Sequence, residues 1–96
     1  MSRSDVLKIL KEFKENHAEE YGILLMGIFG SVARDQATED SDVDVVVKMN
    51  KPNLLTLSRM RIELEELMHV HVDIINYREK MNDFLKKRID SEAVYV

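Results

Sequence analysis

The sequence predicts an α/β fold in which a small mixed β-sheet packs against helices. Segments with apolar residues at helical spacing alternate with short apolar segments, in the order α-β-α-β-α-β-α. The short segments are rich in valine and isoleucine, which favour strands. The 96 residues are 45% hydrophobic and 33% charged, with 3 glycines and 1 proline, which favours one domain over residues 1–96.

The first predicted helix begins at Ser4 or Asp5, either of which can cap it, and ends near Tyr21. Gly22 follows as a residue able to adopt the left-handed conformation that ends many helices. The apolar stripe that we expect to be buried consists of Val6, Ile9, Leu10 and Phe13.

Two strands are expected next, at 23–29 and 43–49, joined by a short helix at 31–35 and a polar loop at 36–41. The segment 23–29 is apolar at every position, so we expect it to be covered on both faces. Gly27 within it predicts a close approach of another backbone segment.

The longest periodic segment, 54–68, predicts a helix, and a strand at 70–75 and a helix from about 79 to 88 follow it. The apolar tail 93–96 is expected to form a small strand, a docking segment, or both. The residues that we expect to face the core from the two helices are Leu57, Met60, Leu64, Leu67, Met68, Met81, Phe84, Leu85 and Ile89.

Asp42 and Asp44 start the second predicted strand and point to the same face, because side chains alternate along a strand. Two neighbouring carboxylates repel each other unless a cation lies between them, and hard oxygen ligands favour Mg²⁺ or Mn²⁺. The alternative is that Asp42 only begins the strand and that Asp44 is exposed. The valines on both sides of Asp44 count against it, because a carboxylate in a buried strand needs a partner.

Two further features favour a site here. Gly30 and Ser31 end the preceding strand, where a glycine allows a close approach of the backbone and a helix N-terminus can hold a phosphate. Asp73 lies in another apolar strand and would join Asp42 and Asp44 if the two strands are neighbours. Three carboxylates beside a phosphate-binding turn suit nucleotidyl transfer, with two divalent ions held by the aspartates and Asp73 as general base.

Gly30-Ser31, ten intervening residues and Asp42-Val43-Asp44 resemble the GS-x10-DxD signature of the polymerase-beta-like nucleotidyltransferase superfamily. The short chain and Val72-Asp73-Ile74-Ile75 are similar to its minimal nucleotidyltransferase (MNT) subgroup. The resemblance implies that Asp42, Asp44 and Asp73 bind Mg²⁺, and that Gly30, Ser31 and Arg34 hold the triphosphate of ATP. Val32 and Asp35 depart from the usual pattern, and Asp35 adds a negative charge near the phosphates.

Many MNT proteins are antitoxins of HEPN-domain ribonuclease toxins, so the resemblance implies transfer of AMP from ATP to a tyrosine of such a toxin. Two alternatives stay open. The chain could neutralise a toxin by binding alone, or it could be a nucleotidyltransferase for a small molecule or RNA.

Other residues allow competing interpretations. His69, His71 and Asp73 share strand parity and could form a zinc site, although surface positions are the expected outcome for both histidines. Lys86 to Arg88 is interpreted as a solvated helix end and not as a nucleic-acid site. Arg61 interrupts an apolar stripe, so it either extends to solvent or marks a partner's docking surface.

The overall composition excludes several classes of protein. The net charge of −4 gives no general attraction for nucleic acid. The chain has no cysteine and hence no disulfides. The longest apolar run has 7 residues, against the ~20 of a membrane-spanning helix, so we expect a cytoplasmic protein without a membrane partner.

Overall fold

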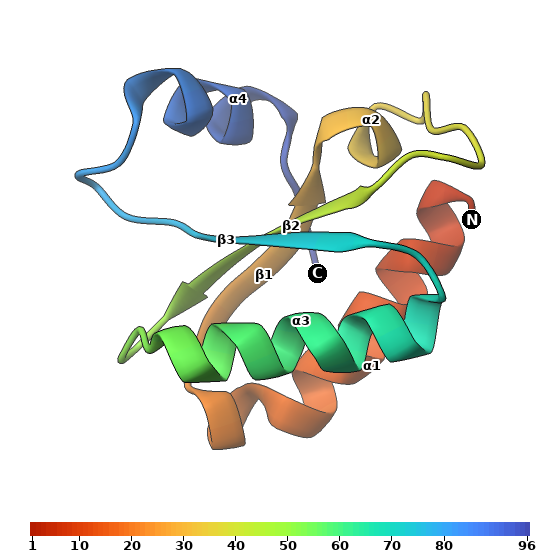
Figure 1. Cartoon of the computed structure of the whole chain (residues 1–96). Helices are drawn as coiled ribbons and strands as arrows, with labels where there is room; N and C mark the ends of the chain where they lie inside the picture. The colour runs from red at the N-terminus through yellow and green to blue at the C-terminus, as the bar shows by residue number, and fades with distance from the viewer.

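The computed structural model describes residues 1–96 and contains four helices and four strands. The predicted class and the alternation of helices and strands are confirmed, and one short strand follows the last helix (Figure 1). The elements are α1 (Arg3–Tyr21), β1 (Ile23–Phe29), α2 (Gly30–Ala33), β2 (Val43–Met49), α3 (Leu54–Met68), β3 (Val72–Asn76), α4 (Asp83–Glu92) and β4 (Val94–Tyr95).

The sheet is mixed, with the strand order β3-β2-β1-β4. β1 pairs antiparallel with β2 and with β4, whereas β2 and β3 run parallel. The parallel pair needs a crossover connection, which α3 supplies. Because of this pairing, the N-terminal ends of β2 and β3 lie side by side.

Helices cover the two faces of the sheet unequally (Figure 1). The long helices α1 and α3 cover one face and enclose the larger core, which contains 17 buried residues. The short helices α2 and α4 lie over the other face, where only Phe29, Val46 and Ile89 form a buried cluster. The second face is therefore partly open, and it is the face that carries the candidate site.

The C-terminal tail forms β4, a strand beside the middle of β1. Gly27 pairs with Tyr95, and a Cβ atom at Gly27 would overlap the backbone of Val94 and Tyr95. The predicted close approach at Gly27 is confirmed. Lys14 also donates a hydrogen bond to the Val96 carbonyl at 2.9 Å, which ties the tail to α1.

Several predicted boundaries are wrong by a few residues. Ser2 caps α1, and not Ser4 or Asp5, because the Ser2 hydroxyl accepts the Asp5 N–H while the Asp5 carboxylate accepts the Ser2 N–H. α4 begins at Asp83, where Asn82 caps it, and it continues to Glu92. β3 begins at Val72 because the chain first leaves α3 through His69 in the left-handed conformation.

Some burial predictions are also wrong. Leu24 and Leu25 in β1 are exposed, so this strand is not covered on both faces along its whole length. The short helices on the second face do not extend over Leu25. Leu67 and Phe84 are also exposed, at 53% and 73%. None of the helices combines the length and the apolar character that crossing a membrane requires.

Candidate active site

The three predicted aspartates lie at the N-terminal ends of the parallel strands β2 and β3. Asp44 and Asp73 are register partners, so their side chains leave neighbouring strands on the same face. Asp42 precedes β2 and is two residues from Asp44, which gives it the same direction. The face is that of α2 and α4, because Val46, two residues after Asp44, packs against Ile89.

Asp44 is the most enclosed carboxylate of the three, with Asp42 exposed and the Asp73 side chain 49% exposed. Burial raises the pKa of the Asp44 carboxyl, and repulsion from Asp73 and Asp42 adds to the rise. The guanidinium groups of Arg88 and Arg34 act in the opposite direction without cancelling it. These surroundings therefore disfavour the charged form of Asp44, which a bound cation would stabilise.

The turn at Gly30 packs directly against Asp44. Gly30 has a φ of +76°, and a Cβ atom there would overlap the Asp44 carboxylate. Both the left-handed conformation and the contact require glycine. The strand-to-helix turn, with the N–H groups at the start of α2, is thus held beside the carboxylates.

Glu92, near the end of α4, lies at the same turn. Its carboxylate accepts the Gly30 N–H at 3.1 Å and the Arg34 guanidinium at 2.7 Å. Burial alone would raise the pKa of Glu92, but the Gly30 N–H and the charges of Arg34 and Arg88 hold it below its usual value. Two of the three predicted phosphate-binding residues therefore already contact an anionic group of the chain itself.

A histidine accompanies the aspartates on the side of β3. His71 Nε2 lies 3.1 Å from Asp73 Oδ1, and His71 Nδ1 lies 3.0 Å from Glu65 Oε2. One donor atom each from Asp42, His71 and Asp73 lie within 4.8 Å of one another. His69 has no place in this group, because it caps the C-terminus of α3. The alternative of a zinc site with His69 therefore fails, and the expected surface positions of His69 and His71 are confirmed.

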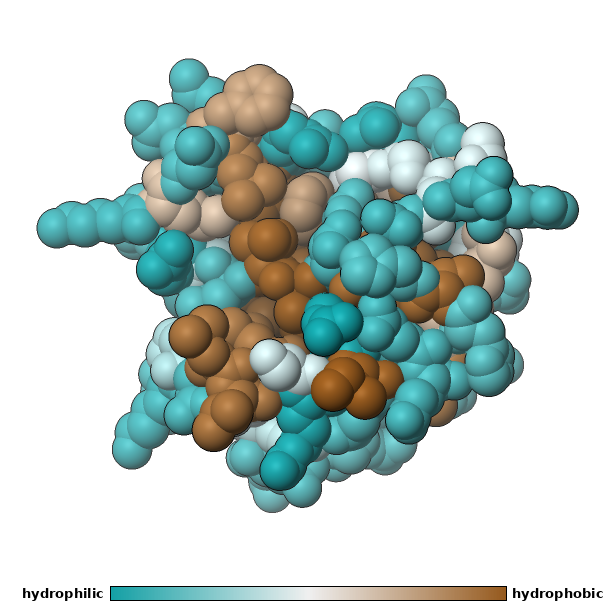
Figure 2. Space-filling model, viewed as in Figure 1, coloured by the Kyte–Doolittle hydropathy of each residue, from teal (hydrophilic) through white to brown (hydrophobic).

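An open cavity of about 440 Å³ lies beside Asp44 and Asp73. A second cavity of about 430 Å³ adjoins it and shares the walls formed by Leu54, Leu57 and Leu85. Figure 2 shows brown, hydrophobic surface running between α4 and the N-terminal half of α3 on this side of the molecule. We call this continuous depression the α3–α4 groove. Its walls also include Phe29, Arg61, Ile74, Ile75, Asn76, Arg78 and Arg88.

Arg88 lies at the candidate site, although the sequence analysis interpreted Lys86 to Arg88 as a solvated helix end. Its guanidinium lies over the Phe29 ring, 5.7 Å from the centroid, and lines the groove beside Asp44. Arg61 pairs with Glu65 at 3.0 Å and also lines the groove. Arg88 and Glu92 are four residues apart, so the sequence indicated that they lie on the same side of one helix. It did not show that this side faces Asp44 and the Gly30 turn.

The donor set fits divalent cations. Asp44 and Asp73 are register partners on the two parallel strands, and Asp42 lies just before β2. Asp42 and Asp73 belong to the group whose donor atoms lie within 4.8 Å of one another, and Asp44 does not. Oxygen donors of this kind are the ligands that Mg²⁺ and Mn²⁺ prefer.

Comparisons with known proteins show the family and the fold of the chain. The nucleotidyltransferase domain family matches residues 6–96. The protein adenylyltransferase MntA of Thermococcus cleftensis is 32% identical over 97 residues, covering 100% of this chain and 97% of that protein. A solved structure of a proposed minimal nucleotidyltransferase superimposes with a TM-score of 0.77 at 32% identity, covering 98% of this chain and 95% of the other.

More distant structures share the fold. A solved complex of an AMP-bearing Shewanella oneidensis HEPN toxin with an MNT antitoxin contains a chain that superimposes on this one with a TM-score of 0.69 at 18% identity. The superposition covers 99% of this chain and 71% of that one.

Proposed function

The chain belongs to the nucleotidyltransferase domain family, and on that premise we propose that it is a protein adenylyltransferase. In this proposal it transfers AMP from ATP to a tyrosine of a HEPN toxin and so acts as an antitoxin. The observation that carries the proposal is the in-register pair Asp44 and Asp73 beside the Gly30 turn. The name of the Thermococcus relative and the AMP-bearing toxin of the Shewanella complex support the acceptor class. We propose the cytoplasm as the compartment, where ATP and such a toxin are both available.

We assign the triphosphate to the turn between β1 and α2. The first N–H groups of a helix have no partner within it, so those of Gly30 and Ser31 can donate to phosphate oxygens. The Arg34 guanidinium, one helical turn later, can pair with the same phosphates. For this to happen, the nucleotide must compete with Glu92 for Gly30 and Arg34.

We assign two Mg²⁺ ions to Asp42, Asp44 and Asp73. When bound, the ions neutralise the phosphate charge and activate the acceptor hydroxyl. The chain itself contributes by holding the three carboxylates on neighbouring strands before any ion arrives, so that little reorganisation is needed.

The proposed reaction is an in-line displacement at the α-phosphorus of ATP. The tyrosine oxygen forms a bond to this phosphorus as the bond to the bridging oxygen breaks, and pyrophosphate leaves. Asp73 takes the phenolic proton, because its side chain is the more exposed member of the strand pair and faces the open groove. Arg88, on the groove wall, is placed to stabilise negative charge during the transfer.

The α3–α4 groove is our candidate for the contact with the acceptor protein. It is continuous with the cavity at Asp44 and Asp73, and Leu54 at its edge is 82% exposed. An exposed leucine beside an apolar groove is a common feature of protein–protein contacts. A partner seated there would bring its tyrosine to the carboxylates.

Leu54→Asp is expected to weaken complex formation with the toxin by about tenfold, because a charge would be placed in an apolar contact. Leu67→Asp is the matched control, since Leu67 is 53% exposed on the same helix but does not line the groove. Surface plasmon resonance with the toxin immobilised measures both. Equal weakening by the two variants would count against the groove as the contact.

Glu92→Gln is expected to tighten ATP binding about three- to tenfold, because glutamine retains the oxygen near Gly30 but removes the charge that competes with the phosphates. Glu79→Gln is the control for net charge, since the exposed Glu79 pairs with Lys86 on the surface. Isothermal titration calorimetry with a non-hydrolysable ATP analogue and Mg²⁺ gives both affinities. Weaker binding by Glu92→Gln would mean that Glu92 positions Arg34 for the nucleotide.

The experiment that tests the function uses the chain together with a HEPN toxin selected by co-purification with it from its source cells. Incubation with ATP and Mg²⁺ should add AMP to one or more toxin tyrosines, located by peptide mass spectrometry, and should lower the toxin's ribonuclease activity. Loss of ribonuclease activity without any AMP on the toxin would instead favour neutralisation by binding alone.

A further inference from the structure

We propose that His71 is a nitrogen ligand of the cation held by Asp42 and Asp73, so that this position takes a divalent transition-metal ion such as Mn²⁺ in preference to Mg²⁺. The inference rests on the proposed function and deepens it, because it replaces Mg²⁺ by a transition-metal ion at one of the two proposed ion positions and leaves the other as Mg²⁺. The sequence offered three aspartates for the ions, and His71 adds a donor of a different chemical type.

The first observation is the placement of His71. One donor atom each from Asp42, His71 and Asp73 lie within 4.8 Å of one another, close enough for one ion to reach all three. The backbone of His71 is fixed at this point, because its carbonyl accepts the Val43 N–H at 3.0 Å. This hydrogen bond joins His71 to the first residue of β2, next to Asp42. The position of the imidazole therefore does not depend on a flexible loop.

The second observation lies outside the donor set. Glu65 on α3 contacts the other ring nitrogen of His71, with 3.0 Å between Oε2 and Nδ1. When Nδ1 donates its proton to Glu65, the lone pair of Nε2 is directed toward the side of Asp73, where Nε2 lies 3.1 Å from Oδ1. A carboxylate behind a histidine is the usual arrangement at metal-binding histidines, because it fixes the tautomer and the ring orientation.

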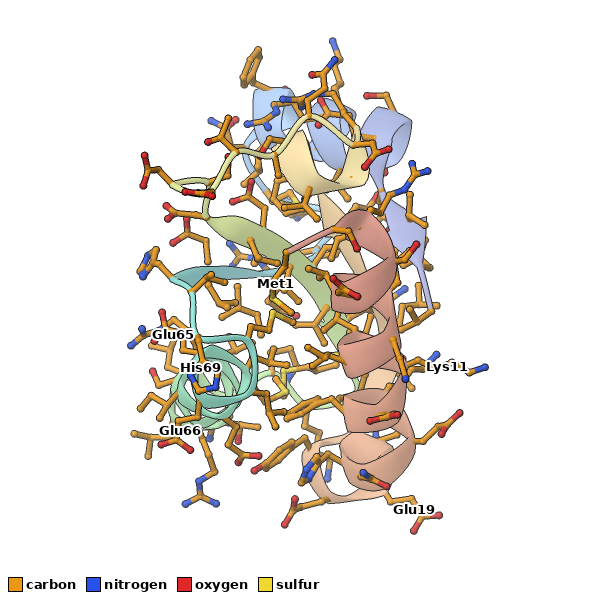
Figure 3. The ribbon with its side chains drawn as sticks, turned by 90° about the vertical axis from the view of Figure 1, so that its right-hand side faces the viewer. Met1, Lys11, Glu19, Glu65, Glu66 and His69 are labelled. Atoms are coloured by element: carbon orange, nitrogen blue, oxygen red, sulfur yellow. The ribbon has the colours of Figure 1, made fainter.

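Glu65 is itself held in place. Its carboxylate accepts the Val72 N–H at 3.0 Å and the Arg61 guanidinium at 3.0 Å. These two contacts fix the Glu65 carboxylate behind the His71 ring. Figure 3 labels Glu65 and His69 at the C-terminal end of α3, so the element that supports His71 is a helix of 15 residues.

A nitrogen donor changes which ion fits best. Mg²⁺ prefers oxygen ligands and retains several waters, whereas imidazole suits the transition metals. Mn²⁺ accepts both carboxylate and imidazole, so two aspartates with one histidine should favour it over Mg²⁺. His69 cannot contribute, because it adopts the left-handed cap conformation at the end of α3.

The test is pulsed electron paramagnetic resonance of the whole chain loaded with Mn²⁺ alone, without nucleotide. Electron spin echo modulation from a directly bound ¹⁴N nucleus is expected in the natural protein and in His69→Gln, and its loss is expected in His71→Gln. His69→Gln is the matched control, since it makes the same substitution two residues away. Absence of ¹⁴N modulation in the natural protein, or its persistence in His71→Gln, would overturn the proposal.

Affinity gives a second measurement. In His71→Gln the Kd for Mn²⁺ should rise about tenfold while that for Mg²⁺ changes less than about twofold, and Glu65→Gln should weaken Mn²⁺ binding by up to about the same tenfold factor through the loss of its support. Circular dichroism confirms that each variant is folded. Equal changes for both ions in His71→Gln would overturn the preference.

The two proposals fail in different ways. Nitrogen-bound Mn²⁺ in a chain that never adenylylates its partner would refute the proposed function and would support His71 as a metal ligand. Adenylyl transfer by a chain whose Mn²⁺ shows no bound nitrogen would refute only the proposal that His71 is a metal ligand.

Discussion

Asp44→Asn is expected to lower the rate of adenylyl transfer by roughly 10³-fold while making the ion-free protein more stable. The rate falls because Asp44 is the carboxylate that links the Gly30 turn to Asp73, and an amide is a much weaker ligand for Mg²⁺. The stability rises because burial and the neighbouring carboxylates raise the pKa of Asp44, so its charge is unfavourable in the folded state.

The sign of the pH dependence follows from the direction of that shift. A carboxyl whose pKa is raised in the folded state stabilises the fold below its unfolded pKa, and this contribution is lost as the pH rises through the folded pKa. Asp44→Asn should therefore show an increase in melting temperature of roughly 2–5 °C at pH 7 and little increase at pH 3. Calorimetry without divalent ions measures both.

Asp40→Asn is the matched control for charge, because Asp40 is exposed in the loop before β2. It should leave both transfer and melting temperature unchanged within error. A melting temperature of Asp44→Asn below that of the natural protein would show that Asp44 stabilises the ion-free fold, contrary to the electrostatics of the site.

Gly30→Ala is expected to reduce transfer by about 10²-fold, because the new Cβ atom would overlap the Asp44 carboxylate and displace it or the turn. Stability should also fall by roughly 1–2 kcal/mol, since alanine is strained at a φ of +76°. Initial rates with saturating ATP, together with urea unfolding, separate the two effects.

Gly22→Ala provides the matched control. Gly22 also has a positive φ, of +65°, but a Cβ atom there would make only ordinary contacts with Asn50. It should lose a similar amount of stability from backbone strain and retain its rate of transfer. If Gly22→Ala lost activity as severely as Gly30→Ala, general destabilisation would explain both and the contact with Asp44 would not.

Local sequence patterns predicted much of the fold. The alternation of helices and strands, the mixed sheet and the bounds of β1, β2 and α3 follow from periodicity and turn residues, and the structure confirms them. The errors in helix bounds are local, because Ser2 and Asn82 act as the caps. The error at Leu25 is tertiary, because the short helices α2 and α4 cover only part of the second face of the sheet. Phe84 lies on α4 itself and is exposed.

Only the part of the candidate site that lies close together in the sequence could be predicted. Asp42, Asp44 and Gly30 share one short stretch of sequence, and strand parity together with the signature suffices to relate them. Glu92 and Glu65 come from helices whose orientation over the sheet is set by packing, so no local pattern connects Glu92 with Gly30 or Glu65 with His71. The sequence suggested His69 as the second metal-binding histidine beside His71, because the third strand was expected to begin at residue 70, whereas β3 begins at Val72.

The most direct test of adenylyl transfer compares ATP labelled at the α-phosphate with ATP labelled at the γ-phosphate. With Mg²⁺ and a HEPN toxin selected by co-purification, the account predicts that label from the α-phosphate becomes covalently attached to the toxin and that label from the γ-phosphate is released as pyrophosphate. The Asp42→Asn, Asp44→Asn double variant should transfer neither label. Covalent γ-label on the toxin, or α-label transferred undiminished by the double variant, would contradict the account.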